Sequence, residues 1–243
     1  MRKLMYLLLL LPLVVISQET ESFLLNLTEI TVKQGHTAQF IEGFKTWKEC
    51  YLENNGEDKW NVWRRVQGEG SVFTMTSNMA NWAEMDESGD AAGKECRMII
   101  VNLIMPHVKS IHRNIARSIP EMSRSTPWPS DTELVNVFNF KTSNSSDFRE
   151  VVGALTSAMK KSEGDTRAVW YSVVGGAPEV ADYFVSVPFK NFAELDIERD
   201  NVWDIYEKVN GKEKAKAIRA KFRNSLSNEW SYMYSLSKSL SNQ

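Results

Sequence analysis

Val62-Trp63-Arg64-Arg65-Val66-Gln67-Gly68 is the stretch that decides the fold, because it recurs in the second half of the chain as Val169-Trp170-Tyr171-Ser172-Val173-Val174-Gly175, at an offset of 107. A second pair follows in the same order. Asn81-Trp82-Ala83-Glu84-Met85-Asp86 recurs as Asn191-Phe192-Ala193-Glu194-Leu195-Asp196, at an offset of 110. The difference between the two offsets indicates a longer second hairpin turn. Two matches in one order indicate an internal duplication, which governs every later assignment.

Hydrophobic periodicity predicts the same order of elements in both halves. Each half is expected to contain a strand, a helix, a two-strand hairpin, a second helical region that begins at an asparagine cap, and a last short strand. In the first half these elements lie at 25–30, 40–51, 60–76, 81–109 and 115–119. In the second half they lie at 134–140, 148–159, 168–187, 191–228 and 232–237.

The order β-α-β-β-α-β is that of the ferredoxin-like unit. Two such units in one chain predict an α+β fold in which two antiparallel sheets face one another. The proline-containing segment 123–130 marks the joint between them. We therefore expect a first repeat at 18–126 and a second at 127–243.

The N-terminus has the pattern of a cleavable export signal. Arg2 and Lys3 precede an apolar run from Leu4 to Ile16, and Ser17 supplies a small residue before a polar stretch. We expect cleavage after Ser17 and a secreted or periplasmic protein. An uncut membrane anchor is the alternative, but the run is shorter than the roughly 20 residues that span a bilayer.

Composition and charge are those of an ordinary globular protein. The chain has 243 residues, of which 42% are hydrophobic and 25% charged, with a formal net charge of −2. Nucleic acid is not expected as a partner, because no run of Lys and Arg supplies a basic surface. The most basic stretch, 208–223, alternates with Glu and Ala and is typical of a solvated helix face.

Cys50 and Cys96 are the two cysteines of the chain. In an oxidising compartment outside the cytosol they can form a disulfide, but cysteine is also a common buried residue. The sequence therefore leaves both the disulfide and the free thiols open. Two cysteines and three histidines match no zinc-binding spacing, and no metal site is expected.

With the repeat and its motifs in hand, the chain resembles the dimeric α/β-barrel superfamily, in which ferredoxin-like units pair sheet to sheet. It is most similar to tandem, signal-bearing members with the hairpin strand Val62–Arg65 and the helix start Asn81–Met85, including the NIPSNAP group. The resemblance implies a pseudo-dimeric barrel. Relatives include haem-degrading and quinone-forming monooxygenases, chlorite-decomposing haem enzymes and stress-responsive barrel proteins, so the resemblance does not by itself transfer a mechanism.

Alternation along the hairpin strands predicts which side chains face the space between the sheets. One phase of the strands is rich in valine and is expected under the helices. The other phase mixes aromatic, guanidinium and amide groups, and we assign it to a ligand-binding cavity. Its members are Trp63, Arg65, Gln67, Trp170 and Ser172.

Two interpretations of this set remain open. Trp63 and Trp170 would sandwich a flat apolar molecule, with Arg65 paired to its carboxylate or phenolate. Alternatively, the two tryptophans fill the barrel and Arg65 is tied to a structural carboxylate.

Histidine is the residue to consider for haem ligation or proton transfer. His107 follows Pro106 near a predicted helix end and is the weak candidate for a haem ligand; a surface or capping role is the alternative. No nucleophile motif or phosphate-binding loop is present. The sequence therefore requires no cofactor.

Two functions follow as hypotheses. The first is an exported barrel of unassigned activity that binds a small apolar or aromatic molecule between its repeats. The second is a monooxygenase or isomerase, with or without haem, acting on a small aromatic or lipid-like substrate. Because both halves are in one chain, either a monomer or a homo-oligomer satisfies the sheet pairing.

Overall fold

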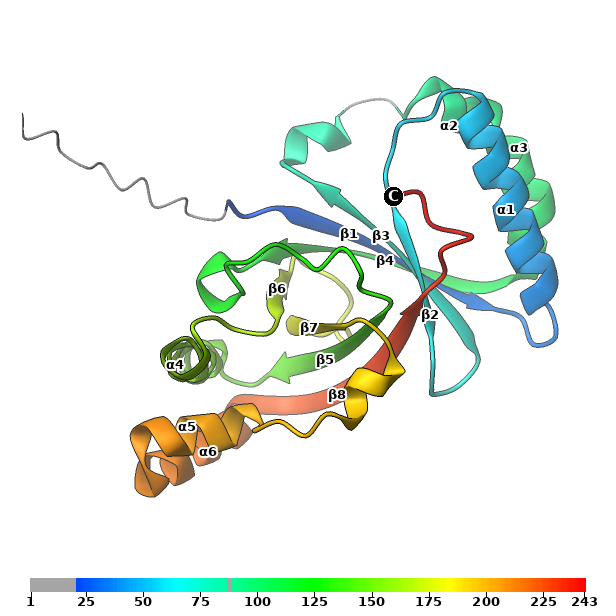
Figure 1. Cartoon of the computed structure of the whole chain (residues 1–243). Coiled ribbons are helices and arrows are strands. Elements are labelled where there is room, and N and C mark those ends of the chain that lie inside the picture. The colour runs from blue at the N-terminus through cyan, green and yellow to red at the C-terminus, as the bar shows by residue number, and fades with distance from the viewer. Residues whose placement is uncertain (1–20, 87–88) are drawn as a thin grey trace, which may run out of the picture.

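A computed structural model describes residues 21–86 and 89–243; the predicted signal at 1–17 lies outside them. The described chain forms an α+β fold around a closed barrel of eight antiparallel strands, in the order β1-β3-β2-β8-β5-β7-β6-β4 (Figure 1). Four strands lie in the first half of the chain: β1 (Leu24–Val32), β2 (Asn61–Arg65), β3 (Ser71–Met79) and β4 (Val108–Ser118). Four lie in the second: β5 (Leu134–Thr142), β6 (Val169–Val173), β7 (Tyr183–Phe189) and β8 (Leu226–Leu236).

The helices cover the outside of the barrel in two groups (Figure 1). The first group contains α1 (Thr37–Glu53), α2 (Ala91–Glu95), α3 (Arg97–Ile99), the π-helical turn η2 (Ile100–Ile104) and η3 (Met105–His107). The second contains α4 (Ser145–Glu163), α5 (Val202–Asn210) and α6 (Lys212–Ser225). Short 3₁₀ turns lie at η1 (Trp82–Met85), η4 (Pro120–Met122) and η5 (Phe192–Asp196).

Strand pairing follows the same register in the two halves. Leu24 lies opposite Met79 and Leu134 opposite Phe189, so β1–β3 and β5–β7 correspond at an offset of 110. The pairings β1–β4 and β5–β8 also correspond, and each is interrupted by a register shift near the end of its first strand, at Thr31/Val32 and Lys141/Thr142. The barrel therefore brings corresponding strands of the two halves to opposite sides of one axis.

A serine beside the barrel binds the same backbone position in each half. Ser241 Oγ accepts a hydrogen bond from the Val62 N–H at 2.9 Å, and Ser123 Oγ accepts one from the Trp170 N–H at 2.9 Å. Each serine hydroxyl also donates to a carbonyl four residues earlier in the chain. These contacts make Val62 the counterpart of Trp170, an offset of 108 rather than the 107 expected from the sequence.

The core lies between the helices and the outer face of the barrel. In the first half, buried aromatic residues from α1, including Phe40 and Phe44, pack on Trp60 and Phe73 of the β2–β3 hairpin region. In the second half, Phe148 of α4 packs on Phe140, Trp170 and Tyr183. The helices thus stabilise the barrel from outside and leave its inner face to other side chains.

Close backbone contact brings α1 against the η2 turn. A Cβ atom added at Gly43 would lie 2.3 Å from the Leu103 carbonyl oxygen, so this position admits only glycine without a shift of backbone. Nearby, Cys50 and Cys96 form a disulfide with a Cα–Cα distance of 5.9 Å, which ties α1 to the end of α2. The sequence left open whether these cysteines are bonded or free, and the structure contains the disulfide.

The asparagine caps are confirmed, but the helical regions differ from the expectation. Asn81 Oδ1 accepts from the Ala83 N–H and Asn191 Oδ1 from the Glu194 N–H. Each caps a single 3₁₀ turn, and longer helices begin only after it. The last strands, expected to be short, are β4 and β8 and begin directly where the helices end. Their first residues are largely polar, which hid the strand period.

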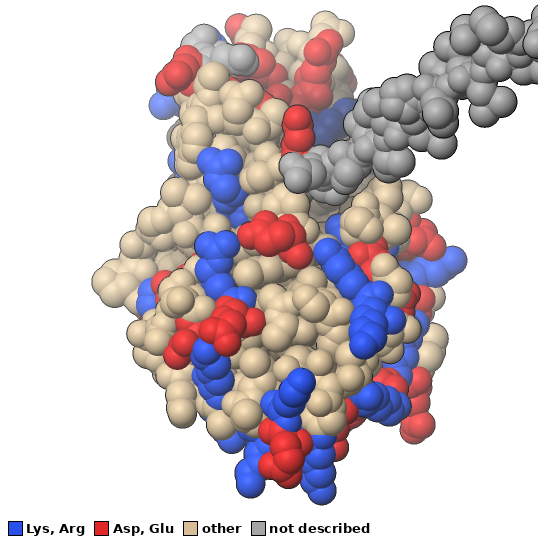
Figure 2. Space-filling model, turned by 90° about the vertical axis from the view of Figure 1, so that its left-hand side faces the viewer, with Lys and Arg blue, Asp and Glu red and all other residues tan. Residues whose placement is uncertain are grey.

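Charged side chains of both signs are interspersed over the face at the left of Figure 1, as Figure 2 shows. The described part of this face carries no extended basic patch. Within residues 21–86 and 89–243, no helix has the length and apolar character needed to cross a bilayer.

Candidate functional site

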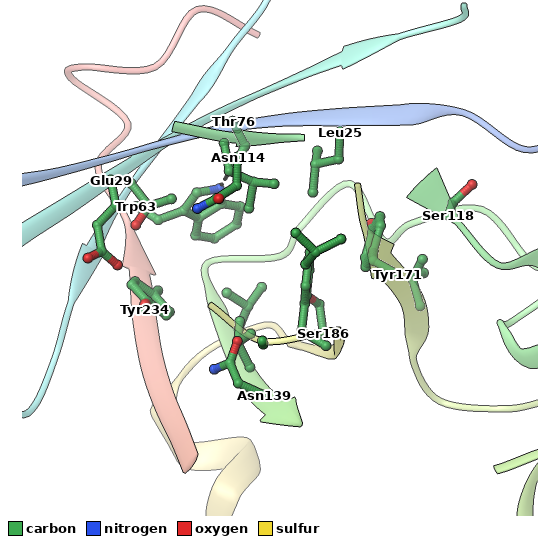
Figure 3. Close-up of a pocket in the computed structure, with 18 of the residues that line it drawn as sticks. Leu25, Glu29, Trp63, Thr76, Asn114, Ser118, Asn139, Tyr171, Ser186 and Tyr234 are labelled. Carbon is green, nitrogen blue, oxygen red and sulfur yellow. Dashed lines mark hydrogen bonds between the residues drawn. The ribbon is translucent and has the colours of Figure 1, made fainter. Parts of the chain in front are cut away.

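A cavity of about 1000 Å³ occupies the interior of the barrel (Figure 3). All eight strands contribute to its wall, and the linker segment that contains Ser123–Trp128 borders it. The volume is at the upper end of the range of small-molecule sites, which are usually about 300–1,000 Å³. Its lining combines apolar, aromatic and polar side chains.

Trp63 projects from β2 into the barrel interior (Figure 3). Its side chain is 9% exposed, and its indole Nε1 donates to Thr76 Oγ1 at 3.1 Å. Because β2 and β3 are paired there, the ring is held against the barrel wall. The hydrogen bond fixes the ring orientation and leaves Trp63 able to contact a molecule in the cavity.

Glu29, Arg65 and Tyr234 form a polar group at one side of the cavity. Figure 3 shows the Glu29 and Tyr234 side chains next to each other. Burial first, and then the nearby Glu29 carboxylate, raise the pKa of Tyr234 well above its usual range, while the Arg65 guanidinium opposes the shift. Tyr234 is therefore neutral at physiological pH and can donate a hydrogen bond.

Arg65 has an unusual environment for a cation. Its guanidinium carbon lies 4.5 Å from the ring centroid of Tyr232, and its Nη2 donates to the Glu69 carbonyl in the adjacent turn. Its Nε is buried without a hydrogen-bond partner among the described residues. The site thus contains a buried donor that lacks an acceptor.

The opposite wall, made by β5, β6 and β7, is largely apolar, with Asn139 and Ser186 as polar side chains. Tyr171 stacks on Phe184 with ring centroids 4.7 Å apart and an interplanar angle of 15°. Val135 and Val137 extend this surface toward the strands of the polar group. Burial raises the pKa of Tyr171 well above its usual range.

The structure places two of the five predicted site residues in the cavity wall. Trp63 and Arg65 line the cavity, whereas Gln67, Trp170 and Ser172 do not. Gln67 lies past the end of β2, where its side-chain oxygen accepts from the Met233 N–H.

Trp170 faces outward and stacks on Phe140 with centroids 5.6 Å apart, beneath α4. The cause of this error is the offset between β2 and β6. A shift of one residue moves every side chain of a strand to the other face. Tyr171 is thus the counterpart of Trp63, and the cavity phase of β6 is the valine-rich one: Val169, Tyr171 and Val173.

His107 is not part of the described cavity wall. Its Nδ1 lies 2.9 Å from the Nδ1 of His36, and its backbone carbonyl accepts from the Lys33 N–H. This position does not fit a haem ligand that faces the cavity. His112, which the sequence did not assign to the cavity, borders it directly opposite Glu29 in the β1–β4 register.

Other lining residues were also missed from the sequence. Glu29 lies in a strand recognised correctly, and its phase alone would have placed it beside Leu25 and Leu27. Tyr234 lies in a strand of which the sequence revealed only the end. In the described part of the chain, no group of three or more His, Cys, Asp or Glu side chains is arranged to hold a metal ion.

Comparisons with known proteins support the fold and do not identify a family. No protein-family model matches the chain. No curated protein matches it either. Among solved structures, a "putative monooxygenase" from Lactobacillus acidophilus superposes with a TM-score of 0.53 at 8% identity, over 89% of this chain and 94% of that one.

A second barrel, a "putative monooxygenase" from Fusobacterium nucleatum, gives a TM-score of 0.52 at 11% identity, over 90% of this chain and 94% of that one. At this level of identity the likeness establishes the fold alone. The chain therefore has the α+β barrel fold of these proteins.

Proposed function

We propose that the barrel interior binds one small, largely apolar molecule. The observation that carries this proposal is the cavity itself. A barrel of eight strands can be filled by its own side chains, but here about 1000 Å³ stays open between a polar group and an aromatic wall. Trp170, expected to fill this space, packs outside it. The ligand-binding role of Trp63 and Arg65 belongs to this proposal.

The two halves are proposed to be tandem ferredoxin-like repeats, at 18–126 and 127–243. Three features support a duplication: the common strand register, the register shift at corresponding positions, and the paired serine contacts. A relationship to the NIPSNAP group is part of the same proposal. One chain then supplies what two ferredoxin-like units supply in a dimeric barrel.

Export is proposed from the signal-like segment 1–17, and the Cys50–Cys96 bridge supports it, because disulfides persist mainly in oxidising compartments. Intact mass measurement of the protein from a native-like host is the test. A chain that begins at Gln18 agrees with the proposal, whereas a full-length chain found in the cytosol refutes it.

A monooxygenase-type activity on the bound molecule is a second candidate function. The fold likeness to two barrels named as putative monooxygenases supports it, as do the carboxylate of Glu29 and the imidazole of His112 at the cavity wall. Oxygen uptake in the presence of molecules that bind the cavity is the measurement. Uptake that Glu29→Gln abolishes supports the enzyme, and no uptake with any bound molecule refutes it.

Binding in the barrel is tested with 1-anilinonaphthalene-8-sulfonate, whose fluorescence increases in apolar sites. The native protein is expected to bind it saturably. Val137 contributes to both hydrophobic clusters of the interior, so Val137→Trp should fill the cavity and abolish binding. Phe138→Trp is the matched control, because Phe138 is the next residue of β5, is 37% exposed and faces outward.

Equal binding by the native protein and Val137→Trp would refute the proposal, provided that circular dichroism shows both variants folded. The dye would then lie on the surface rather than in the barrel.

A further inference from the structure

Corresponding positions of the two halves carry different chemistry on the cavity wall. The strand registers and the paired serine contacts relate each lining residue of the first half to one of the second. Three acidic or basic side chains on the inward phase of the first-half strands have uncharged counterparts on the second-half strands. The pairs are Glu29 with Asn139, Arg65 with Val173, and His112 with Trp230.

The barrel is therefore symmetric in its backbone and polarised in its interior. A symmetric wall would accept a ligand in two equivalent orientations. A wall with charge at one side and stacked rings at the other distinguishes the two ends of a molecule.

Arg65 is the charged lining residue whose side chain has a buried atom without a partner in the described part of the chain. In the described residues neither Arg65 nor Glu29 takes part in an ion pair. The buried Nε of Arg65 lacks an acceptor there, although a buried donor without a partner costs about 1–3 kcal/mol. Arg65 as a whole is partly exposed and borders the cavity, so its guanidinium can pair with an oxygen of a ligand.

The second-half strands place no charged side chain on the cavity wall; Asn139 and Ser186 are polar, and Arg124 and Glu179 border the cavity from the connecting segments. Tyr171 and Phe184 present a stacked pair, and Val137 and Val173 lie beside it. This surface suits an apolar ring, since aromatic pairs favour stacked or edge contacts.

We propose that the cavity selects a molecule with an anionic oxygen at one end and an apolar ring body at the other. The anionic group lies against Arg65, and the ring body lies against the Tyr171–Phe184 pair. This inference rests on the proposed binding function and adds to it the chemical class and the orientation of the ligand.

The Glu29 carboxylate provides a second test of the proposal, because its negative charge repels an anionic ligand. Glu29 and Arg65 both act on Tyr234, one raising and the other lowering its pKa, so both charges lie within electrostatic reach of one phenol. A ligand anion at Arg65 thus experiences repulsion from Glu29. Removal of the Glu29 charge should strengthen anion binding, and removal of the Arg65 charge should weaken it.

The test uses four matched ligands: 2-naphthoate, 2-naphthol, naphthalene and 2-naphthylmethylamine. Their affinities are measured by displacement of the anilinonaphthalene dye from the full mature protein at pH 7. The native protein is expected to bind 2-naphthoate most tightly and the amine most weakly.

Arg65→Val places in the first half the residue that the second half has at the corresponding position. It should weaken 2-naphthoate about tenfold to a hundredfold and leave naphthalene within about twofold. Glu29→Gln should tighten 2-naphthoate by about threefold to tenfold, less at high salt. Arg64→Val is the control, because Arg64 is the adjacent arginine on the outer face of β2, and it should change neither ligand.

The outcomes separate the two proposals. If the dye itself does not bind in the barrel, as judged by Val137→Trp, the proposed binding function is wrong as well. If the dye binds there and none of the four ligands displaces it, the binding function stands and the polarity inference is overturned. If all four bind equally, or if Arg65→Val weakens naphthalene as much as 2-naphthoate, the barrel binds small molecules but the polarity inference is overturned.

Discussion

Tyr171 and Tyr234 are the residues whose chemistry the barrel changes most. Burial raises the pKa of both phenols well above the usual value, so both stay neutral in the folded state where an unfolded chain ionises them. Their contribution to stability is fully present below about pH 10 and is lost as the pH rises above it. Well above that pH, each further unit should cost about 1.4 kcal/mol for each such tyrosine.

Tyr171→Phe tests this at a single residue. The substitution retains the stack on Phe184 and removes the ionisable group. Between pH 10 and pH 11 the free energy of unfolding should fall less steeply for Tyr171→Phe than for the native protein, by about 1 kcal/mol. Urea unfolding at the two pH values measures it. Identical slopes would contradict a buried Tyr171.

The strands β2 and β6 show why the sequence predicted the inward face of one strand correctly and of the other wrongly. The alternation along β2 placed Trp63 and Arg65 on the correct face, because alternation within one strand needs no alignment between the repeats. The face of β6 was inferred from the repeat, where Val62-Trp63 and Val169-Trp170 match in identity. The chain instead superposes Trp63 on Tyr171. A longer turn and a shifted register cannot be distinguished from identity alone.

The β6 strand shows how one register connects packing with the site. Trp170 lies beneath α4 in contact with Phe140 and Phe148, whereas Tyr171 faces the cavity. The Ser123 contact to the Trp170 N–H holds this register, as the Ser241 contact does for β2.

Trp170→Ala should therefore affect folding and not binding. Loss of the ring from beneath α4 should lower the free energy of unfolding by about 3 kcal/mol, the low end for a large aromatic residue, since Trp170 is only half-buried. Binding of the anilinonaphthalene dye at a temperature where the variant is folded should be unchanged. A variant of native stability that no longer bound the dye would place Trp170 in the cavity after all.

Other elements differ in how far the sequence defined them. The strands β1 and β5 and the helices α1 and α4 have clear apolar periods and were predicted closely. The strands β4 and β8 begin with polar residues, such as Lys109, His112 and Asn228, so their apolar alternation appears only near the ends. The sequence therefore did not identify the cavity residues on these two strands.

The whole molecule is held by a barrel that joins distant parts of the chain and by one covalent link. The Cys50–Cys96 disulfide joins positions separated by 46 in the sequence. By loop-closure entropy such a link stabilises the folded state by up to about 4 kcal/mol. The Cys50→Ser/Cys96→Ser variant should lose most of that, and the native protein should show the same loss after reduction.

Calorimetric or urea unfolding of the double variant and of native protein, with and without dithiothreitol, measures this loss. Dithiothreitol should not change the variant. Equal stability of oxidised and reduced native protein would contradict the bridge as a stabilising element.

The central claim is that the barrel interior is a polarised ligand site. A crystal structure of residues 18–243 soaked with 2-naphthoate tests it most directly. The account predicts one molecule inside the barrel, with its carboxylate within hydrogen-bond distance of Arg65 and its rings against Tyr171 and Phe184. An empty barrel at a saturating concentration, or a molecule in the opposite orientation with its carboxylate toward Phe184, would contradict it.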